Sequence, residues 1–412
     1  MKAPQTYTGI DIGSSAVRVI VAQKEANSED VKILGVGVVP MRGMQKGVIT
    51  DVEEAVAALG EARDMAERVS GVMVERAYVS INGSHLTSHN LRGIIAVSRA
   101  DGEITSDDVD RVINAAQAIS MPQNRAILHV LPQNYIVDGQ EHISDPVGMT
   151  GVRLEVEAHV VEGSAPFIKN LTKVVNQAGV HIEDFVFAPL ACELAVLDKR
   201  QKELGVVLVD LGAGTTSMVV YEEHVLLHTS VLPMGASHIT NDIAIGLRTS
   251  LDIAEALKVS HGSALPDTVS QNETISVEGE EDVDESVSRK DVANIISARL
   301  DELLSFVDKE LKAIGRSGIL PAGVIITGGG AHMEGIVELA KKKLRLPVRI
   351  GRPKMLAGLS DRTDEPEYSV GIGLIYFAIA QEHRPSSHNA IRLPNVGATI
   401  SKVRQWAKTF LP

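Results

Sequence analysis

The sequence has very few cysteines and aromatic residues, and it contains no long hydrophobic run. Its single cysteine, Cys192, excludes an internal disulfide and is typical of a reducing compartment. Aromatic residues make up only 3% of the 412 residues, which argues against base stacking on single-stranded nucleic acid. No stretch reaches the roughly 18 apolar residues that a membrane-spanning helix needs. The first residues also lack a secretory signal pattern. These absences predict a cytoplasmic protein.

Positive charge is also in short supply. The chain has 40 Lys and Arg residues against 53 Asp and Glu residues, which gives a net charge of −13. This balance argues against a broad surface for nucleic acid or membrane, although it leaves room for a local basic patch. The length predicts at least two domains with ample core.

Three glycine-rich turns, each after a short apolar strand, predict a phosphate-binding site. Gly205–Val219 (GVVLVDLGAGTTSMV) and Thr8–Val21 (TGIDIGSSAVRVIV) share one order of Asp, Gly and hydroxyl residues, and Val324–Ile336 (VIITGGGAHMEGI) adds a third turn. Glycines bring backbone N–H groups close to phosphate oxygens, hydroxyls add donors, and a carboxylate suits Mg²⁺ or its bound water. One such turn alone is more often structural, so the repetition carries the prediction. The candidate residues are Asp11, Gly13, Ser14, Ser15, Asp210, Gly212, Gly214, Thr215, Thr216, Gly328, Gly329 and Gly330.

Strands that alternate with helical patterns predict an α/β fold. Residues 84–162 interrupt the alternation without a phosphate-type turn, so they are either an assembly lobe or an extra structural lobe. Asp267–Ser288 carries eight carboxylates and no basic residue, which predicts a solvated loop or hairpin tip. The strands that we expect are a hairpin at 7–23, Val31–Val39, Gly47–Asp51 as a continuation of that sheet, Arg76–Ile81 and Gly323–Thr327. The helices that we expect include Val52–Ser70, Ser164–Ala178, Pro189–Arg200, Arg289–Ile314 and Tyr368–Ala380.

The C-terminal end combines a linker with a short basic amphipathic segment. Residues 381–396 contain two prolines and two serines without periodicity, which predicts a flexible linker. In residues 397–412, apolar side chains recur mostly at spacings of three and four, and every charged side chain is basic. This pattern predicts a helix that anchors the chain to an anionic membrane surface, with a helix docked on the body or on a partner as the alternative. The membrane-facing candidates are Ile400, Lys402, Val403, Arg404, Trp406, Lys408, Phe410 and Leu411.

The two hairpins and the Gly-Gly-Gly turn resemble the nucleotide site of the actin, sugar-kinase and heat-shock-chaperone superfamily. Within it, the chain resembles the FtsA family of bacterial actin-like cell-division proteins nearly from end to end. The family-like stretches are GMQKGVITD (43–51), AYVSINGSH (77–85), MGASHITNDIA (234–244), VSHG (259–262) and GGGAHMEGI (328–336).

The resemblance implies a two-domain actin-like ATPase fold that binds ATP and Mg²⁺ between its domains. Asp11 and Asp210 would organise the Mg²⁺ ion and water, and Gly328, Gly329 and Gly330 would contact adenosine. Glu255 and Lys258 are similar to a pair that contacts the nucleoside in the chaperone branch, although alone they read as a surface ion pair. In that branch a Glu precedes the Pro of the helix before the second hairpin, and Ala188 stands here. We therefore expect slow ATP hydrolysis at most.

The resemblance also implies partners and a location. Members of this family bind the C-terminal peptide of the tubulin-like division protein FtsZ, form filaments with themselves and recruit later division proteins. Arg289, Lys290 and Arg299 would hold the acidic FtsZ peptide, with a solvated helix face as the alternative. No nucleic acid is expected as a partner. The protein would lie on the cytoplasmic face of the inner membrane at the division site.

The implied division of the chain follows the same family. The first actin-like subdomain would comprise 1–83 and 163–198, with an inserted lobe at 84–162. The second would comprise 199–230 and 305–380, with a smaller FtsZ-binding lobe at 231–304, a linker at 381–396 and the membrane helix at 397–412.

Two other functions fit the nucleotide motifs. A small-molecule kinase of the same superfamily would need a catalytic Asp and a polar substrate pocket, and it would not need a tethered basic tail. A chaperone-like ATPase would carry a large substrate-binding domain after the nucleotide core, but only residues 381–412 follow here.

Overall fold

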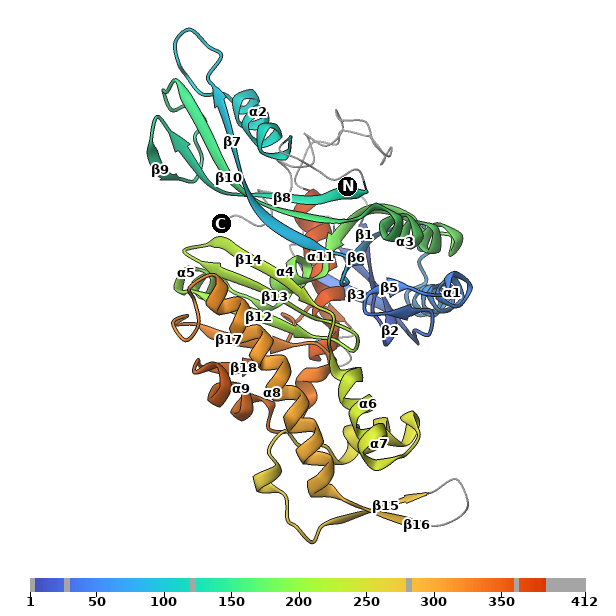
Figure 1. Ribbon diagram of the computed structural model, residues 1–412. Helices are drawn as coiled ribbons and strands as arrows, with labels where there is room; N and C mark the ends of the chain where they lie inside the picture. The colour runs from blue at the N-terminus through green and yellow to red at the C-terminus, as the bar shows by residue number, and fades with distance from the viewer. Residues whose placement is uncertain (1–3, 26–29, 119–123, 279–283, 359–362, 383–412) are drawn as a thin grey trace.

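The computed structural model describes residues 4–25, 30–118, 124–278, 284–358 and 363–382 (Figure 1). The predicted linker, from residue 383 onward, and the predicted membrane helix lie outside the described residues, so both remain predictions. Among the described helices, none is long and apolar enough to cross a membrane.

A six-stranded sheet forms the first domain. It contains the predicted hairpin, and its parallel neighbours join that hairpin on one side. The interior strands are filled with buried Val, Ile and Ala, which explains their β propensity. The strand β11, which carries two acidic residues in its middle, escaped the sequence analysis. The strands in sheet order are β11 (His181–Phe187), β6 (Arg76–Ile81), β1 (Gln5–Ile12), β2 (Ala16–Lys24), β3 (Val31–Pro40) and β19 (Ala357–Gly358).

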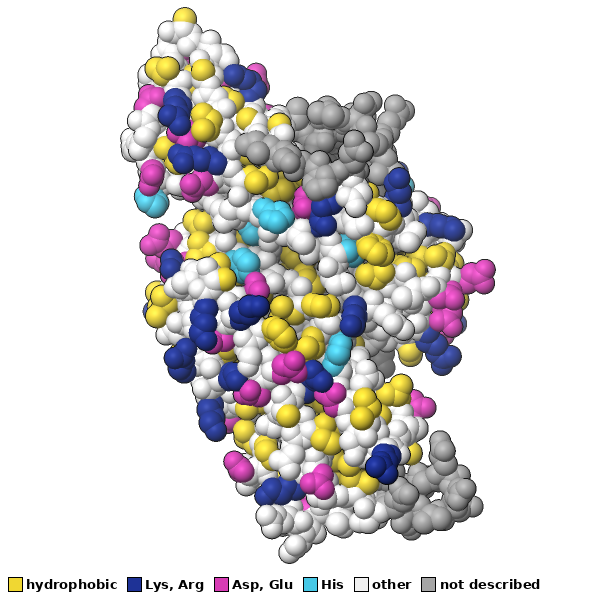
Figure 2. Space-filling view, viewed as in Figure 1, with side chains coloured by type: hydrophobic (Ala, Val, Ile, Leu, Met, Phe, Trp, Pro, Cys, Tyr) yellow, Lys and Arg dark blue, Asp and Glu magenta, His cyan; other side chains and the backbone are white. Residues whose placement is uncertain are grey.

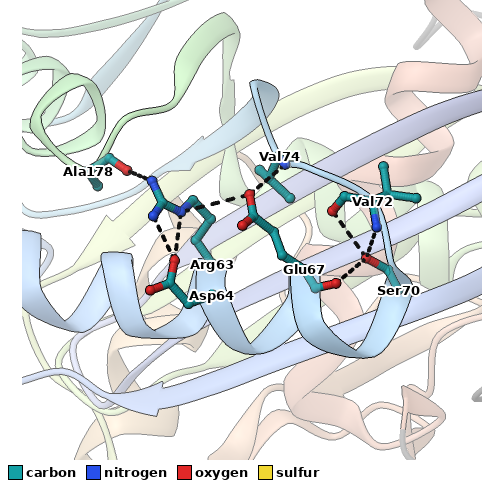
Figure 3. Close-up of polar contacts among 7 residues, drawn as sticks. All are labelled: Arg63, Asp64, Glu67, Ser70, Val72, Val74 and Ala178. Atoms are coloured by element: carbon teal, nitrogen blue, oxygen red, sulfur yellow. Dashed lines mark hydrogen bonds and ion pairs between the residues drawn. The ribbon is translucent and has the colours of Figure 1, made fainter.

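Helices α1 (Val52–Ser70) and α3 (Ala165–Gln177) pack against this domain, as their apolar spacing predicts. Figure 3 shows how polar contacts fix α1 to the C-terminal end of α3 and to the loop that follows α1. Arg63 of α1 donates a hydrogen bond of 2.5 Å to the carbonyl of Ala178, the residue that follows α3, and pairs with Asp64 at 2.6 Å. Glu67 accepts a bond of 2.7 Å from the N–H of Val74 and so fixes the loop that leads into β6.

A five-stranded sheet forms the second domain and repeats the plan of the first. In each domain an antiparallel hairpin is flanked by a strand parallel to its first member: β6 beside β1, and β17 beside β12. Helices α8 (Arg289–Ala313) and α9 (Ile336–Leu344) pack with this domain. The strands in sheet order are β14 (Val225–Leu232), β13 (Thr216–Glu222), β12 (Val206–Leu211), β17 (Gly323–Thr327) and β18 (Val348–Ile350).

The chain crosses between the domains at α4 (Ala188–Val196) and α5 (Lys199–Leu204), which the sequence analysis expected as one helix over Pro189–Arg200. That expectation is wrong, because Asp198 caps the N-terminus of α5 and breaks the helix before it. Helix α11 (Ser369–Glu382) crosses α4 at Gly373, where a Cβ atom would lie only 1.8 Å from the carbonyl oxygen of Ala191. The two helices therefore pack backbone against backbone.

The inserted segment folds as a lobe with its own sheet and core (Figure 1). Its sheet order is β7 (Thr87–Ala96), β10 (Arg153–Ser164), β8 (Arg125–Val137) and β9 (Gln140–Ile143). Helix α2 (Ser106–Gln117) packs against β7 and β10, and Thr105 is its N-cap.

Two small hairpins complete the fold. The acidic stretch contains the paired strands β15 (Thr274–Glu278) and β16 (Asp284–Ser288), so of the two predicted alternatives, a loop or a hairpin, the hairpin is present. Helices α6 (Ala236–Leu247) and α7 (Leu251–His261) precede it in the chain. Strands β4 (Met44–Gln45) and β5 (Val48–Ile49) pair only with each other among the described strands. The expectation that Gly47–Asp51 continues the main sheet is therefore wrong.

Candidate functional site

A cavity of about 520 Å³ lies where the two sheets present their hairpin turns to each other. It gathers residues from all three glycine-rich turns and from α7. The predicted residues that line it are Asp11, Gly13, Ser14, Ser15, Asp210, Gly212, Gly214, Thr215, Glu255, Lys258, Gly328, Gly329 and Gly330.

The two hairpin turns have the same backbone geometry. Gly13 donates its N–H to the carbonyl of Ala16 at 3.1 Å, and Gly212 donates to Thr215 at 3.0 Å. The turns also touch each other, because a Cβ atom at Gly214 would lie 2.7 Å from the hydroxyl of Ser14. Two glycine-and-hydroxyl turns from separate domains thus converge on one space, which suits the phosphate chain of a nucleotide.

Asp11 and Asp210 are the penultimate residues of the first strand of each hairpin, and both line the cavity. The Asp11 carboxylate accepts a hydrogen bond of 2.8 Å from the hydroxyl of Ser80. Burial raises the pKa of Asp11. Burial, together with the charge of Asp11, raises the pKa of Asp210 to about 7. Two carboxylates in such a place favour a divalent cation, which would stabilise their ionised forms.

Gly328 is the glycine that must come closest to Asp210. Its φ of 82° lies in the left-handed region, and a Cβ atom there would lie 2.3 Å from Asp210 Oδ1. The third turn therefore packs its bare backbone against the carboxylate of the second.

Arg18 also lines the cavity, and the sequence analysis missed it. It lies directly across the β1–β2 pair from Asp11. Its positive charge lowers the pKa of both Asp11 and Asp210 against the effect of burial. Its guanidinium carbon lies 5.5 Å from the ring centre of Tyr368. The signal was available, because residues opposite each other in a hairpin share a face of the sheet.

Glu255 and Lys258 lie at the cavity and are an i,i+3 ion pair at the same time. The Lys258 ammonium lies 2.6 Å from Glu255 and donates to the hydroxyl of Thr240 at 2.9 Å. Lys258 is only 9% exposed, whereas the Glu255 side chain is 51% exposed, so the pair is buried at its cation and solvated at its carboxylate.

Thr216 is the one predicted phosphate-turn residue that does not line the cavity. Its side chain is fully buried, and its hydroxyl donates to the carbonyl of Met234 at 2.8 Å. Thr216 begins β13, so its side chain joins the strand's alternation, whereas Thr215 belongs to the turn. The role of Thr216 is to hold the loop before α6.

Ala188 also lines the cavity, at the first residue of α4. Its methyl group can neither orient nor deprotonate a water molecule. At the cavity rim, His332, Glu365 and Glu367 form the one group of described residues with the geometry to hold a metal ion by three ligands. Glu365 is engaged by Arg352 at 2.9 Å.

The three basic residues predicted to bind a peptide lie on α8. Arg299 binds Asp242 through two nitrogens, at 2.5 and 2.9 Å, and Arg289 lies 2.9 Å from Glu273 and 3.2 Å from Glu334. Lys290 is half-buried beside Arg289. Acidic and basic side chains are interspersed over the face that Figure 2 shows. The structure thus places Arg289 and Arg299 in local ion pairs.

Comparisons of the sequence with known families give consistent matches. Residues 207–373 match the family described as cell division protein FtsA, and residues 83–162 match the SHS2 domain inserted in FtsA. The chain is 38% identical to cell division protein FtsA of Pseudomonas aeruginosa over 383 residues, which covers 93% of this chain and 91% of that one. It is 40% identical to the Bacillus subtilis protein of the same name, with coverages of 92% and 84%. For the Escherichia coli K12 protein the identity is 34%, with coverages of 97% and 97%.

Solved structures with this fold include actin-like proteins. The type IV pilus biogenesis complex PilM–PilN matches with a TM-score of 0.64 at 15% identity, covering 89% of this chain and 97% of that chain. MreB5 of Spiroplasma citri bound to AMPPNP matches with a TM-score of 0.55 at 12% identity, covering 92% and 97%. These likenesses confirm the predicted actin-like architecture.

Proposed function

This chain belongs to the FtsA family of cell-division proteins, and from that premise we propose that it is an ATP-binding, actin-like filament protein. In this proposal it tethers the FtsZ ring to the cytoplasmic face of the inner membrane at the division site and recruits later division proteins. The observation that carries the nucleotide part is the convergence on one cavity of two hairpin turns with the same backbone hydrogen bond, each preceded by an Asp. The small-molecule kinase is not favoured, because the relatives at 34–40% identity are division proteins.

The residues present fit ATP and Mg²⁺. Backbone N–H groups of the two turns, with the hydroxyls of Ser14, Ser15 and Thr215, would hold the phosphates. Asp11 and Asp210 would hold the Mg²⁺ ion, which neutralises charge on the phosphate oxygens when it is bound. The remaining predicted contacts, to adenosine and the nucleoside, fall to Gly328, Gly329, Gly330, Glu255 and Lys258. Because Ala188 lines the cavity where an acid would activate water, slow hydrolysis at most is expected.

The FtsZ peptide would bind at Arg289, Lys290 and Arg299. The ion pairs of the two arginines support this in one respect, because they show carboxylates in good geometry on both guanidinium groups. An acidic peptide would then exchange with Glu273 or Asp242, so binding would depend strongly on salt. The inserted lobe at 84–162 would serve self-assembly and later division proteins, the smaller lobe at 231–304 the FtsZ peptide, and the segment 397–412 the anionic membrane.

The nucleotide part is tested with the Asp210→Ala variant of the full chain. Calorimetry with Mg²⁺ and ATP should show strongly weakened binding, and ATP-dependent assembly should be lost while the circular dichroism spectrum is unchanged. Asp107→Ala, a matched change at an exposed position on α2, should bind ATP as the parent does. Unchanged ATP affinity in Asp210→Ala would contradict the site assignment.

The membrane part is tested by co-sedimentation with anionic vesicles in the presence of ATP. The full chain should pellet, and a chain that ends at Val396 should not. Salt or Trp406→Glu should weaken pelleting. If both chains stay in the supernatant, the terminal segment is a partner helix or a docked element, and the tether is rejected.

A further inference from the structure

The hairpin of β4 and β5 places its tip against both phosphate turns. Its two-residue turn consists of Lys46 and Gly47, with φ values of 50° and 76°, which is the left-handed pair of a type I′ turn. The N–H of Gly47 donates to the hydroxyl of Ser14 at 3.1 Å. Gly47 itself lines the cavity. The tip is thus tied to the first phosphate turn.

The same tip reaches the second domain. A Cβ atom at Gly214 would lie 2.9 Å from the backbone nitrogen of Lys46. On its other side, a Cβ atom at Gly47 would lie 2.7 Å from the carbonyl oxygen of Asn82 at the end of β6. Three backbones therefore meet at the tip without room for a side chain at Gly47 or Gly214. The tip therefore forms part of the cavity wall where the two domains meet.

Lys46 is an unusual residue for its position. Glycine, Asn and Asp are the usual residues of a type I′ turn, because other side chains carry a steric cost in the left-handed region. Lys46 is exposed, and no ion pair among the described residues engages its ammonium group. Lys46 itself is not among the residues that line the cavity, but its neighbour Gly47 lines it together with Asp11 and Asp210. An ammonium group that reaches this cavity would offset the negative charge that a bound nucleotide adds to that of the two carboxylates.

We propose that the Lys46–Gly47 tip is a third phosphate-binding element, in which the Lys46 ammonium contacts the terminal phosphate of a nucleoside triphosphate. This inference rests on the proposed nucleotide binding and adds which phosphate is recognised. A lysine suits the task because it is a compact charge on a flexible stem, which reaches a phosphate without a fixed hydrogen-bond fork. A diphosphate leaves the tip without its ligand, so the tip makes the site prefer ATP to ADP. Because the tip touches Gly214, the triphosphate also strengthens the contact between the domains.

The test compares ATP and ADP binding to Lys46→Asn in the full chain, with Mg²⁺, by calorimetry. Asn keeps the left-handed turn and removes the charge. The ATP dissociation constant should rise roughly tenfold to a hundredfold, the range of a lost hydrogen bond to a charged group, while the ADP constant changes less than about twofold. Lys46→Arg should retain most of the preference for ATP.

Arg42→Asn is the matched control, because it removes the same charge from an exposed position just before β4. It should bind both nucleotides as the parent chain does. Equal weakening of ATP and ADP in Lys46→Asn would show that the tip only supports the two turns, and no weakening would show that Lys46 touches neither nucleotide. Either result overturns the inference while the parent still binds ATP. If the parent chain itself binds neither nucleotide, this inference and the proposed function both fail.

Discussion

Lys202 and Glu193 form an ion pair in which the carboxylate is completely buried on α4, the helix through which the chain leaves the first domain. The hydroxyl of Tyr221 donates to the same carboxylate at 3.3 Å, and the Lys202 ammonium lies 4.6 Å from the Tyr221 ring centre. Burial raises the pKa of Glu193, and the charge of Lys202 opposes that rise. The pair therefore joins α4 to α5 and to β13 of the second domain at the place where the chain crosses.

Loss of Lys202 should destabilise the protein more than a surface change would. Lys202→Met leaves Glu193 buried without its cation, for which a loss of about 3 kcal/mol of unfolding free energy is expected. The measurement is the urea midpoint at neutral pH. Lys199→Met removes an exposed lysine of the same helix and should leave the midpoint nearly unchanged.

A second substitution separates the charge from the packing. Glu193→Gln in the Lys202→Met background removes the unpaired carboxylate and should restore most of the loss. If the double variant is no more stable than Lys202→Met alone, the loss came from packing of the lysine stem rather than from the ion pair.

Lys354 joins the two places where the chain passes between the domains: the passage at α4 and α5, and the later return from β18 to β19. Its ammonium donates to the carbonyl of Leu197 at 2.7 Å and to that of Leu194 at 3.2 Å, at the end of α4. Its backbone N–H donates to Ala195 at 2.9 Å. Residue 354 lies between β18 in the second domain and β19 in the first, so both crossings meet at the C-terminal end of one helix.

The inserted lobe is fastened to the second domain by side chains. His159 of β10 lies with one ring nitrogen 2.9 Å from the hydroxyl of Thr229 and with the other 2.6 Å from Asn90. Ser88 donates to the carbonyl of Thr229 at 2.8 Å. These bonds cover β14, which is the edge strand of its sheet. The lobe is therefore linked to the first domain by the chain itself and to the second domain by these hydrogen bonds.

The burial of His159 predicts a dependence of stability on pH. Burial and the nearby charges of His228 and His89 lower the pKa of His159 to about 3. The unfolded chain binds the proton near pH 6.5, so the folded state loses stability as the pH falls below that value, down to the folded pKa. At about pH 5, His159 should lower the free energy of unfolding by about 2 kcal/mol relative to neutral pH. Urea unfolding of His159→Gln should show a shallower fall between pH 7 and 5 than the parent chain.

His142→Gln is the control for that slope. His142 is exposed on β9, so its replacement should leave the pH dependence of the parent chain in place. A slope in His159→Gln equal to that of the parent would mean that other groups, and not the lobe contact, set the acid sensitivity.

The sequence was sufficient to predict the two hairpins of the site. It was insufficient to predict the residues that pack around them. The order of Asp, Gly and hydroxyl residues is local, so Asp11 and Asp210 could be placed at strand ends that meet. Arg18 was missed although its position opposite Asp11 in the hairpin was a usable signal, because the search for a phosphate turn considered only Asp, Gly and hydroxyl residues. Thr216 was assigned to the site because the sequence does not show where the turn ends and β13 begins.

Contacts between distant segments set the remaining features. Gly47 packs between Ser14 and Asn82, which are far from it in the chain, and no local sequence pattern predicts this contact. The break before Asp198 was readable, because Asp198 and Gln201 form a capping box, but the apolar helical run before it concealed that signal. The strand β11 was hidden because it has acidic residues where most interior strands have Val or Ile.

The raised pKa of Asp210 predicts that binding of Mg²⁺ and ATP releases a proton. With a pKa of about 7, Asp210 is largely protonated in slightly acid solution when no cation is bound. A bound Mg²⁺ ion favours the ionised carboxylate, so affinity should rise with pH up to about 7 and then level off. Calorimetry at about pH 6 in two buffers of different ionisation enthalpy counts the protons released. The parent chain should release a substantial fraction of one proton, and Asp210→Asn should bind more weakly and release less. Asp107→Asn, a change at an exposed position on α2, should behave as the parent chain does. If the affinity of the parent chain does not depend on pH, Asp210 is already ionised before the cation binds.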